Sequence, residues 1–149
     1  MGDLSEAAKA EFDSFIDTHG FLSQLGVELV EVEEGRAVMQ IPYDETLTNP
    51  SMRGAASVHG GVASTLIDTA SAFALRTTFE DPGSAKLATI DLTVSYLRPA
   101  IGDLRADAEV VRAGGRVGVT RVTVTSETPD DGVAPVATGM TNYRLFRTR

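Results

Sequence analysis

One stretch, residues 59–75, limits what this chain can fold into more than any other. It begins His59-Gly60-Gly61 and holds a single acidic residue, Asp68. A helical spacing of about 100° per residue puts apolar side chains on one side and mostly small or polar ones on the other. The apolar side carries Val62, Leu66, Ala70, Phe73 and Ala74. Because a helix that is apolar or small all round is normally enclosed, we expect the fold and a partner chain to surround it.

The composition predicts one globular domain, residues 1–149. A chain of 149 residues can bury roughly two-thirds of its unfolded surface. Its content of 42% hydrophobic and 23% charged residues is ordinary for a globular protein. No apolar run approaches the roughly 20 residues of a membrane span. The absence of cysteine excludes disulfides and thiolate catalysis, and two histidines, His19 and His59, argue against a histidine metal site. We therefore expect no metal, no cofactor and no membrane insertion.

The net charge of −8 argues against a nucleic-acid partner, because phosphate binding needs a concentrated basic surface. The arginines are scattered along the sequence, yet a few could converge around a small phosphorylated ligand. Residues 1–11 lack the basic start and apolar middle of a signal peptide, so we expect a cytoplasmic protein.

The first half of the chain predicts an N-terminal helix, two strands and the long helix. Within residues 1–25, Ser5 can cap an amphipathic helix and His19-Gly20 offers an ending. From Gly26 the apolar period changes to two, with a hairpin turn at residues 33–36. Proline and glycine make residues 43–58 a loop, and the central helix is expected over residues 60–77.

The second half predicts four more strands. Over residues 88–96 the alternation places Thr89 and Asp91 on the face opposite Leu92. The valines after Gly114-Gly115 switch from odd to even positions, which indicates a bulge near Thr120. A four-strand meander follows the helix in this interpretation. The predicted fold is α+β, with one antiparallel sheet curved around the central helix.

Four features together match a known pattern: Asn49, His59-Gly60-Gly61, Asp68, and the strand from Thr89 to Leu97-Arg98-Pro99. With them the chain resembles the hotdog-fold acyl-CoA thioesterases of the phenylacetate-degradation and 4-hydroxybenzoyl-CoA types. The most specific element is His-Gly-Gly with an acidic residue nine positions after the histidine. The resemblance implies a hotdog fold whose active sites are shared between the subunits of a homodimer or of a homotetramer built from two dimers.

The resemblance also implies roles for individual residues. The N–H of Gly60 would polarise the thioester carbonyl, Asp68 would act as general base or nucleophile, and the Thr89 hydroxyl would help to place water. The family usually has Asn or Gln six residues before the histidine, where this chain has Arg53; the nearest asparagine, Asn49, lies ten residues before it. We therefore include Asn49 among the candidate catalytic residues. Three more residues are candidates for substrate binding: His59, Gly61 and Arg98.

Elementary chemistry gives the same residues a rationale and leaves alternatives open. Gly60 and Gly61 offer N–H groups at the positive end of the helix dipole, although glycines also permit close packing. Asp68 could equally be a buried structural carboxylate, and His59 either holds the loop or only packs. Gly60 and Asp68 are eight residues, about 12 Å, apart along a helix, too far to touch one carbonyl. If both act, they come from different chains.

The sequence thus predicts an enzyme that hydrolyses acyl-CoA thioesters to free acid and CoA. The main alternative is a non-catalytic acyl-CoA-binding or regulatory hotdog protein. A hotdog hydratase or dehydratase ranks third, because its paired histidine and acid motif is not found. The acyl group and the choice between dimer and tetramer stay open.

Overall fold

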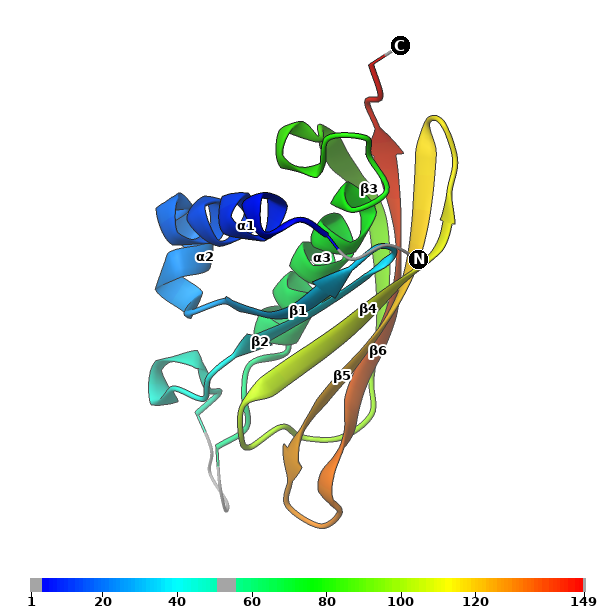
Figure 1. Ribbon diagram of the computed structural model, residues 1–149. Helices are drawn as coiled ribbons and strands as arrows, with labels where there is room; N and C mark the ends of the chain where they lie inside the picture. Colours follow the sequence, from blue (N-terminus) through cyan, green and yellow to red (C-terminus); the bar gives the residue numbers. More distant parts are fainter. Residues whose placement is uncertain (1–3, 51–55, 149) are drawn as a thin grey trace.

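The computed structural model describes residues 4–50 and 56–148 of the chain. One six-stranded antiparallel sheet curves around a single long helix, α3 (Gly60–Arg76), which lies against its concave face (Figure 1). The predicted α+β arrangement is therefore confirmed. In the described part of the chain, no helix is long and apolar enough to cross a membrane.

The strands are joined in the order β1-β2-β4-β5-β6-β3. Their bounds are β1 Glu28–Glu33, β2 Arg36–Ile41, β3 Leu87–Tyr96, β4 Leu104–Ala113, β5 Val117–Thr128 and β6 Gly132–Leu145. The predicted four-strand meander is wrong, because only β4, β5 and β6 follow one another. β3 pairs with β6 and forms the sheet edge, since residues 97–103 carry the chain across to β2 instead of making a tight turn.

The predicted N-terminal helix is two helices, α1 (Glu6–Thr18) and α2 (Gly20–Leu25). Ser5 caps α1 as expected, by accepting a hydrogen bond from the N–H of Ala8. His19 ends α1 and caps α2, since its Nδ1 accepts from the N–H of Leu22. In Figure 1 the pair lies beside α3 and β1, in blue.

A bulge in β3 corrects the predicted facing of that strand. Thr89 pairs with Tyr143 and Asp91 with Asn142, so Ile90 is an extra residue between them. The extra residue turns Thr89 toward α3, onto the same face as Leu92, while Asp91 stays on the outer face. Strict alternation could not have predicted this change.

The bulge expected near Thr120 lies instead in the neighbouring strand. Val110 of β4 pairs with Thr120 and Arg112 pairs with Val119, which leaves Val111 as the extra residue. The burial of β5 alternates without interruption, with Gly118 and Thr120 filling the inward positions before the inward valines begin. The change from odd to even valines therefore reflects residue choice and not a change of backbone register.

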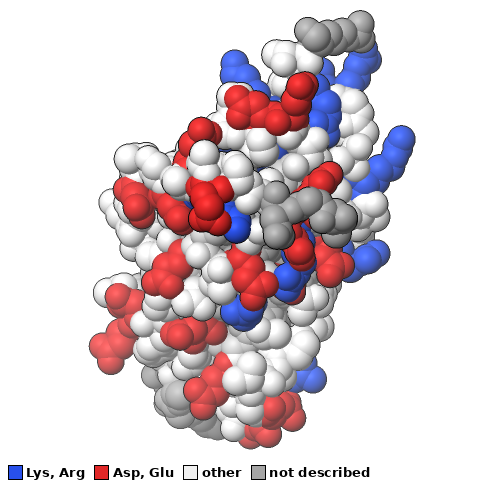
Figure 2. All heavy atoms as spheres, viewed as in Figure 1, with Lys and Arg blue, Asp and Glu red and all other residues white. Residues whose placement is uncertain are grey.

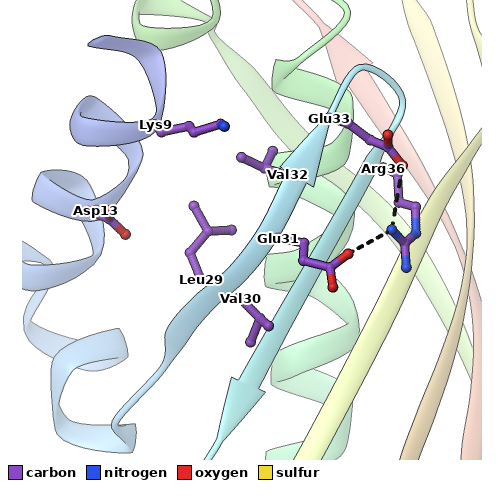
Figure 3. A pocket seen from close by; sticks show the side chains of 8 residues that line it. All are labelled: Lys9, Asp13, Leu29, Val30, Glu31, Val32, Glu33 and Arg36. Atoms are coloured by element: carbon purple, nitrogen blue, oxygen red, sulfur yellow. Dashed lines mark hydrogen bonds and ion pairs between the residues drawn. The ribbon is translucent and has the colours of Figure 1, made fainter. Parts of the chain in front are cut away.

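Acidic side chains are spread over the face of the molecule that carries α1, α2 and β1, with lysines and arginines interspersed (Figure 2). On this face a hollow of about 420 Å³ separates α1 from β1. At its rim, Arg36 donates to Glu31 and Glu33 (Figure 3). Arg36 also makes two hydrogen bonds to Asp107, which raise the pKa of its guanidinium above the usual value. This cluster ties β1, β2 and β4 together.

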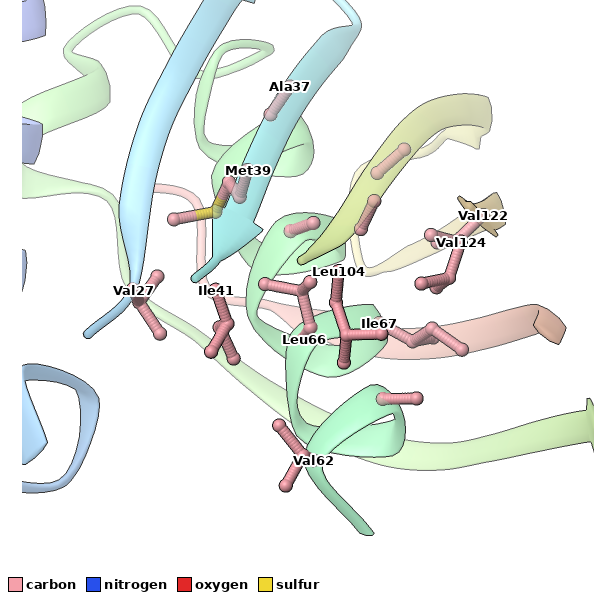
Figure 4. Packing of buried hydrophobic residues seen from close by; sticks show 14 of the residues in the cluster. Val27, Ala37, Met39, Ile41, Val62, Leu66, Ile67, Leu104, Val122 and Val124 are labelled. Atoms are coloured by element: carbon pink, nitrogen blue, oxygen red, sulfur yellow. The ribbon is translucent and has the colours of Figure 1, made fainter. Parts of the chain in front are cut away.

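The main core lies between α3 and the sheet, where Leu66 and Ile67 of the helix are fully buried. Figure 4 shows them packed against apolar side chains of β2, β4 and β5. A buried polar link runs beside this core, because Thr120 donates to Ser71 of α3 and shares a hydrogen bond with Thr141 of β6.

Replacing Thr120 with valine should lower the free energy of unfolding by about 1–3 kcal/mol, because Ser71 and Thr141 lose their buried partner. Denaturant titration measures the change. Thr123→Val is the matched control, since Thr123 lies on the same strand with its side chain on the outer face. Equal losses in the two variants would show that the hydroxyl link contributes nothing.

Candidate active site

The start of α3 is shaped by a side-chain cap and two glycines. The Nδ1 atom of His59 accepts a hydrogen bond from the N–H of Gly61 at 2.8 Å, and the His59 carbonyl accepts from the N–H of Val62. A side chain at Gly61 would meet the His59 ring at 2.9 Å, so the cap requires glycine there. His59 is thus a helix cap, and the Gly61 N–H already donates its hydrogen bond to His59.

Gly60 leaves its own N–H free of partners among the described residues. Its carbonyl accepts a hydrogen bond from the hydroxyl of Tyr96 at 2.7 Å, and that hydroxyl also bonds Ser64. A Cβ at position 60 would lie 3.0 Å from the Tyr96 ring. The glycine therefore allows the aromatic ring to rest on the helix start, with an unpaired donor beside it at the positive end of the helix dipole.

Asp68 lies two turns further along α3, facing the start of β3. Its Oδ1 atom accepts hydrogen bonds from two hydroxyls, Thr89 at 2.8 Å and Tyr143 of β6. The Tyr143 hydroxyl also lies 2.6 Å from the Asp68 carbonyl oxygen. No described residue donates to Oδ2, so one carboxylate oxygen is anchored and the other is free.

Tyr143 is a permanent hydrogen-bond donor in this arrangement. The side chain is 2% exposed. Burial, followed by the nearby Asp68 carboxylate, raises the pKa of Tyr143 above its ordinary value. The hydroxyl consequently keeps its proton throughout the neutral and moderately alkaline range.

The Asp68 carboxylate and the Gly60 N–H lie at different hollows of the same chain. Asp68 borders a hollow of about 460 Å³ between α3, the N-terminal helices and the start of β3. Gly60 borders another of about 400 Å³ between the helix start, Tyr96 and the segment after β3. No described residue lines both hollows. Within one chain, then, the free N–H and the free carboxylate oxygen do not meet.

Two further candidates from the sequence are placed less centrally. Asn49 is half-buried and its N–H donates to the carbonyl of Ser57, but it lines neither hollow of the described structure. Arg98 borders the Gly60 hollow, where its guanidinium donates to Asp131 and to the carbonyl of Pro135. Arg53 lies outside the described residues.

Sequence reasoning missed two tyrosines that belong to these sites. Tyr143 carried no local signal, because it lies 75 residues from Asp68 in the sequence and reaches it only through the packing of β6 against α3. Tyr96 lies at the end of β3 opposite Gly60, where its hydroxyl donates a hydrogen bond to the helix start. A strand that ends beside a His-Gly-Gly segment is the signal that could have identified it.

One helix enclosed by a curved antiparallel sheet, with a histidine cap at its start and an anchored carboxylate midway, defines a hotdog protein. A family model described as thioesterase superfamily matches residues 56–133. The chain belongs to this superfamily, and the resemblance stated from the sequence is confirmed.

Individual relatives agree with this assignment. A Halobacterium salinarum protein provisionally named an esterase is 48% identical over 97% of this chain and 96% of its own. The acyl-coenzyme A thioesterase PaaI of Escherichia coli is 33% identical over 69% of each chain. A solved thioesterase family protein from Silicibacter pomeroyi has a TM-score of 0.80 at 27% identity, over 95% of this chain and 98% of that one.

Proposed function

We propose that this protein hydrolyses acyl-CoA thioesters to the free acid and CoA. The observation that carries the proposal is the Asp68 carboxylate, held through Oδ1 by Thr89 and Tyr143 with Oδ2 free beside a hollow. The acyl-CoA thioesterase relative supports the choice of substrate class. A carboxylate oriented in this way is suited to take a proton from an attacking water.

In the proposed mechanism, Oδ2 of Asp68 accepts a proton as the water oxygen bonds to the thioester carbonyl carbon. The N–H of Gly60 donates to the oxygen that becomes negative. The intermediate collapses by breaking the carbon–sulfur bond, and the CoA thiolate leaves and takes up a proton. If Asp68 attacks instead of water, the carbon–sulfur bond breaks to leave a mixed anhydride between Asp68 and the acyl group. A single turnover in ¹⁸O-water then places the label in Asp68 when water attacks the Asp68 carbonyl carbon of that anhydride.

Thr89 has a different role here from the one first expected of it. Its hydroxyl donates to Asp68 at 2.8 Å, so it orients the carboxylate. Tyr143 supplies a second donor to the same oxygen. We assign no step to Asn49, and Gly61 and His59 serve to shape the helix start.

We propose that the working unit contains a two-fold dimer made through β3. β3 runs antiparallel to α3, since Thr89 contacts Asp68 at one end and Tyr96 contacts Gly60 at the other. Pairing two β3 edges antiparallel would bring the Tyr96 end of one chain beside the Thr89 end of its partner. Gly60 of one subunit and Asp68 of the other would then share a site. Ile90, Tyr96 and Leu97 are each about half exposed at this edge and would be covered.

The test is a thiol-release assay with purified protein on aryl and aliphatic acyl-CoA esters. Steady release of CoA is expected for at least one class, and binding without release would favour the acyl-CoA-binding alternative. Absence of both turnover and binding would refute the proposal.

Replacing Tyr143 with phenylalanine should lower kcat about tenfold with little change in KM, because Asp68 loses one of its two anchors. Tyr43→Phe is the control, because Tyr43 is exposed and lines neither hollow. An unchanged kcat in Tyr143→Phe would mean that this anchor of Asp68 does not contribute to catalysis.

A further inference from the structure

The Asp68 hollow continues along α3 to a second charged group, Arg76. Asp68, Ala72 and Arg76 recur every four residues and all line the hollow. The backbones of Asp68 and Arg76 are about 12 Å apart along the helix axis, and helical side chains lean toward the N-terminus, which shortens the gap. An acyl group whose thioester carbon sits beside Asp68 can therefore extend toward Arg76.

His19, Ser64, Thr65 and Thr69 also line the hollow, but the walls between these two ends are largely apolar and aromatic. Phe15 and Phe21 of the N-terminal helices, Phe73 of α3 and Leu87 and Leu92 of β3 contribute to them. Phe15 and Phe21 are about half exposed, and the Phe15 ring meets the Phe73 ring edge-on at a centroid distance of 5.9 Å. Such walls suit the hydrocarbon body of a ligand.

The Arg76 guanidinium at the far end has no counter-ion among the described residues. No described carboxylate lies within ion-pair distance of it, although it is half-buried. Its Nη1 donates to the Ala85 carbonyl at 2.9 Å, and the group lies 5.1 Å from the Phe15 ring centroid and 5.7 Å from that of Phe73. Nε is sealed from solvent without a partner, and Nη2 makes no hydrogen bond to a described residue.

The contacts that Arg76 makes within the described residues do not fully offset the cost of burying its charge. Burial lowers the pKa of Arg76 from its usual value, which reflects the cost of holding a cation there. Two phenyl rings and one carbonyl offset only part of that cost, because a desolvated guanidinium is best satisfied by a planar anion with two acceptor oxygens. A carboxylate has this geometry.

We propose that the acyl pocket accepts thioesters of dicarboxylic acids, with the free carboxylate at the distal end of the chain bound by Arg76. The inference rests on the proposed thioesterase function and names the substrate class for the same site. The apolar walls hold the methylene chain, Arg76 selects for a terminal anion, and the reacting thioester lies at the Asp68 end.

The experiment compares matched pairs of substrates by thiol release: adipyl, suberyl and sebacyl CoA against hexanoyl, octanoyl and decanoyl CoA. For at least one chain length, kcat/KM should favour the ω-carboxyl ester by about tenfold to a hundredfold, the range that a charge-assisted hydrogen bond supplies. Arg76→Met should abolish this preference while hydrolysis of the monocarboxylic esters persists, and Arg76→Lys should keep part of it.

Arg121→Met is the control, since Arg121 is an exposed arginine on the outer face of β5. If wild-type protein prefers the monocarboxylic esters as strongly as Arg76→Met does, the inference is wrong and the thioesterase function stands. If no ester is cleaved, the function itself fails. Calorimetric binding of suberate against octanoate, to wild type and to Arg76→Met, then decides the role of Arg76 independently of turnover.

Discussion

Replacing Asp68 with asparagine should lower kcat for acyl-CoA hydrolysis by about a hundredfold to ten-thousandfold, the usual contribution of a general base. The amide has the shape of the carboxylate and can still accept hydrogen bonds from Thr89 and Tyr143, so the fold should be kept. It cannot take a proton from water. Thiol release under single-turnover conditions measures the loss, and chromatography verifies that the oligomer persists.

Asp91→Asn is the matched control for that variant. Asp91 is a carboxylate on the same strand as Thr89, but it faces outward and accepts a hydrogen bond from Asn142. Its replacement should leave kcat unchanged. Undiminished turnover in Asp68→Asn would remove the carboxylate from the mechanism and with it the proposed function.

Replacing Gly60 with proline should lower kcat about a hundredfold to a thousandfold relative to Gly60→Ala, the usual effect of removing an oxyanion donor. Proline is well tolerated at the first position of a helix, and the extended His59 before it, with φ −57° and ψ 133°, suits a following proline. Both variants add a Cβ that meets the Tyr96 ring, so that contact cancels in the comparison, and what differs is the replacement of the N–H by the proline ring. Equal kcat values would mean that the Gly60 N–H does not bind the oxyanion.

The same two variants show whether a site is shared between subunits. Subunits carrying Gly60→Pro and Asp68→Asn are inactive separately under the proposed arrangement. A mixed dimer contains one site in which both Gly60 and Asp68 are intact, so re-equilibrated mixtures should recover about a quarter of wild-type activity. If both groups act within one chain, mixing restores nothing.

Much of the fold could be predicted from the chain because its signals are local. The helix expected over residues 60–77 is observed from Gly60 to Arg76, since its apolar period extends over four turns. The strand that begins at Leu104 alternates as expected, with Leu104, Ala106 and Ala108 buried. The edge position of β3 was not predictable in this way, because hydrophobic alternation carries no information on which strands pair.

The candidate site also combines features visible in the sequence with contacts that depend on long-range packing. The sequence by itself singled out Gly60 and Asp68 as candidates, because a His-Gly-Gly segment and one acid in an apolar helix are visible in the sequence. Only the tertiary structure brought Thr89 and Tyr143 to the same carboxylate oxygen, since one contact depends on a bulge and the other on the pairing of β3 with β6. It also decided the surroundings of Arg76, because Phe15 of α1 packs against its guanidinium and none of the described carboxylates pairs with it. Periodicity determines which residues face inward, and long-range packing determines what they meet there.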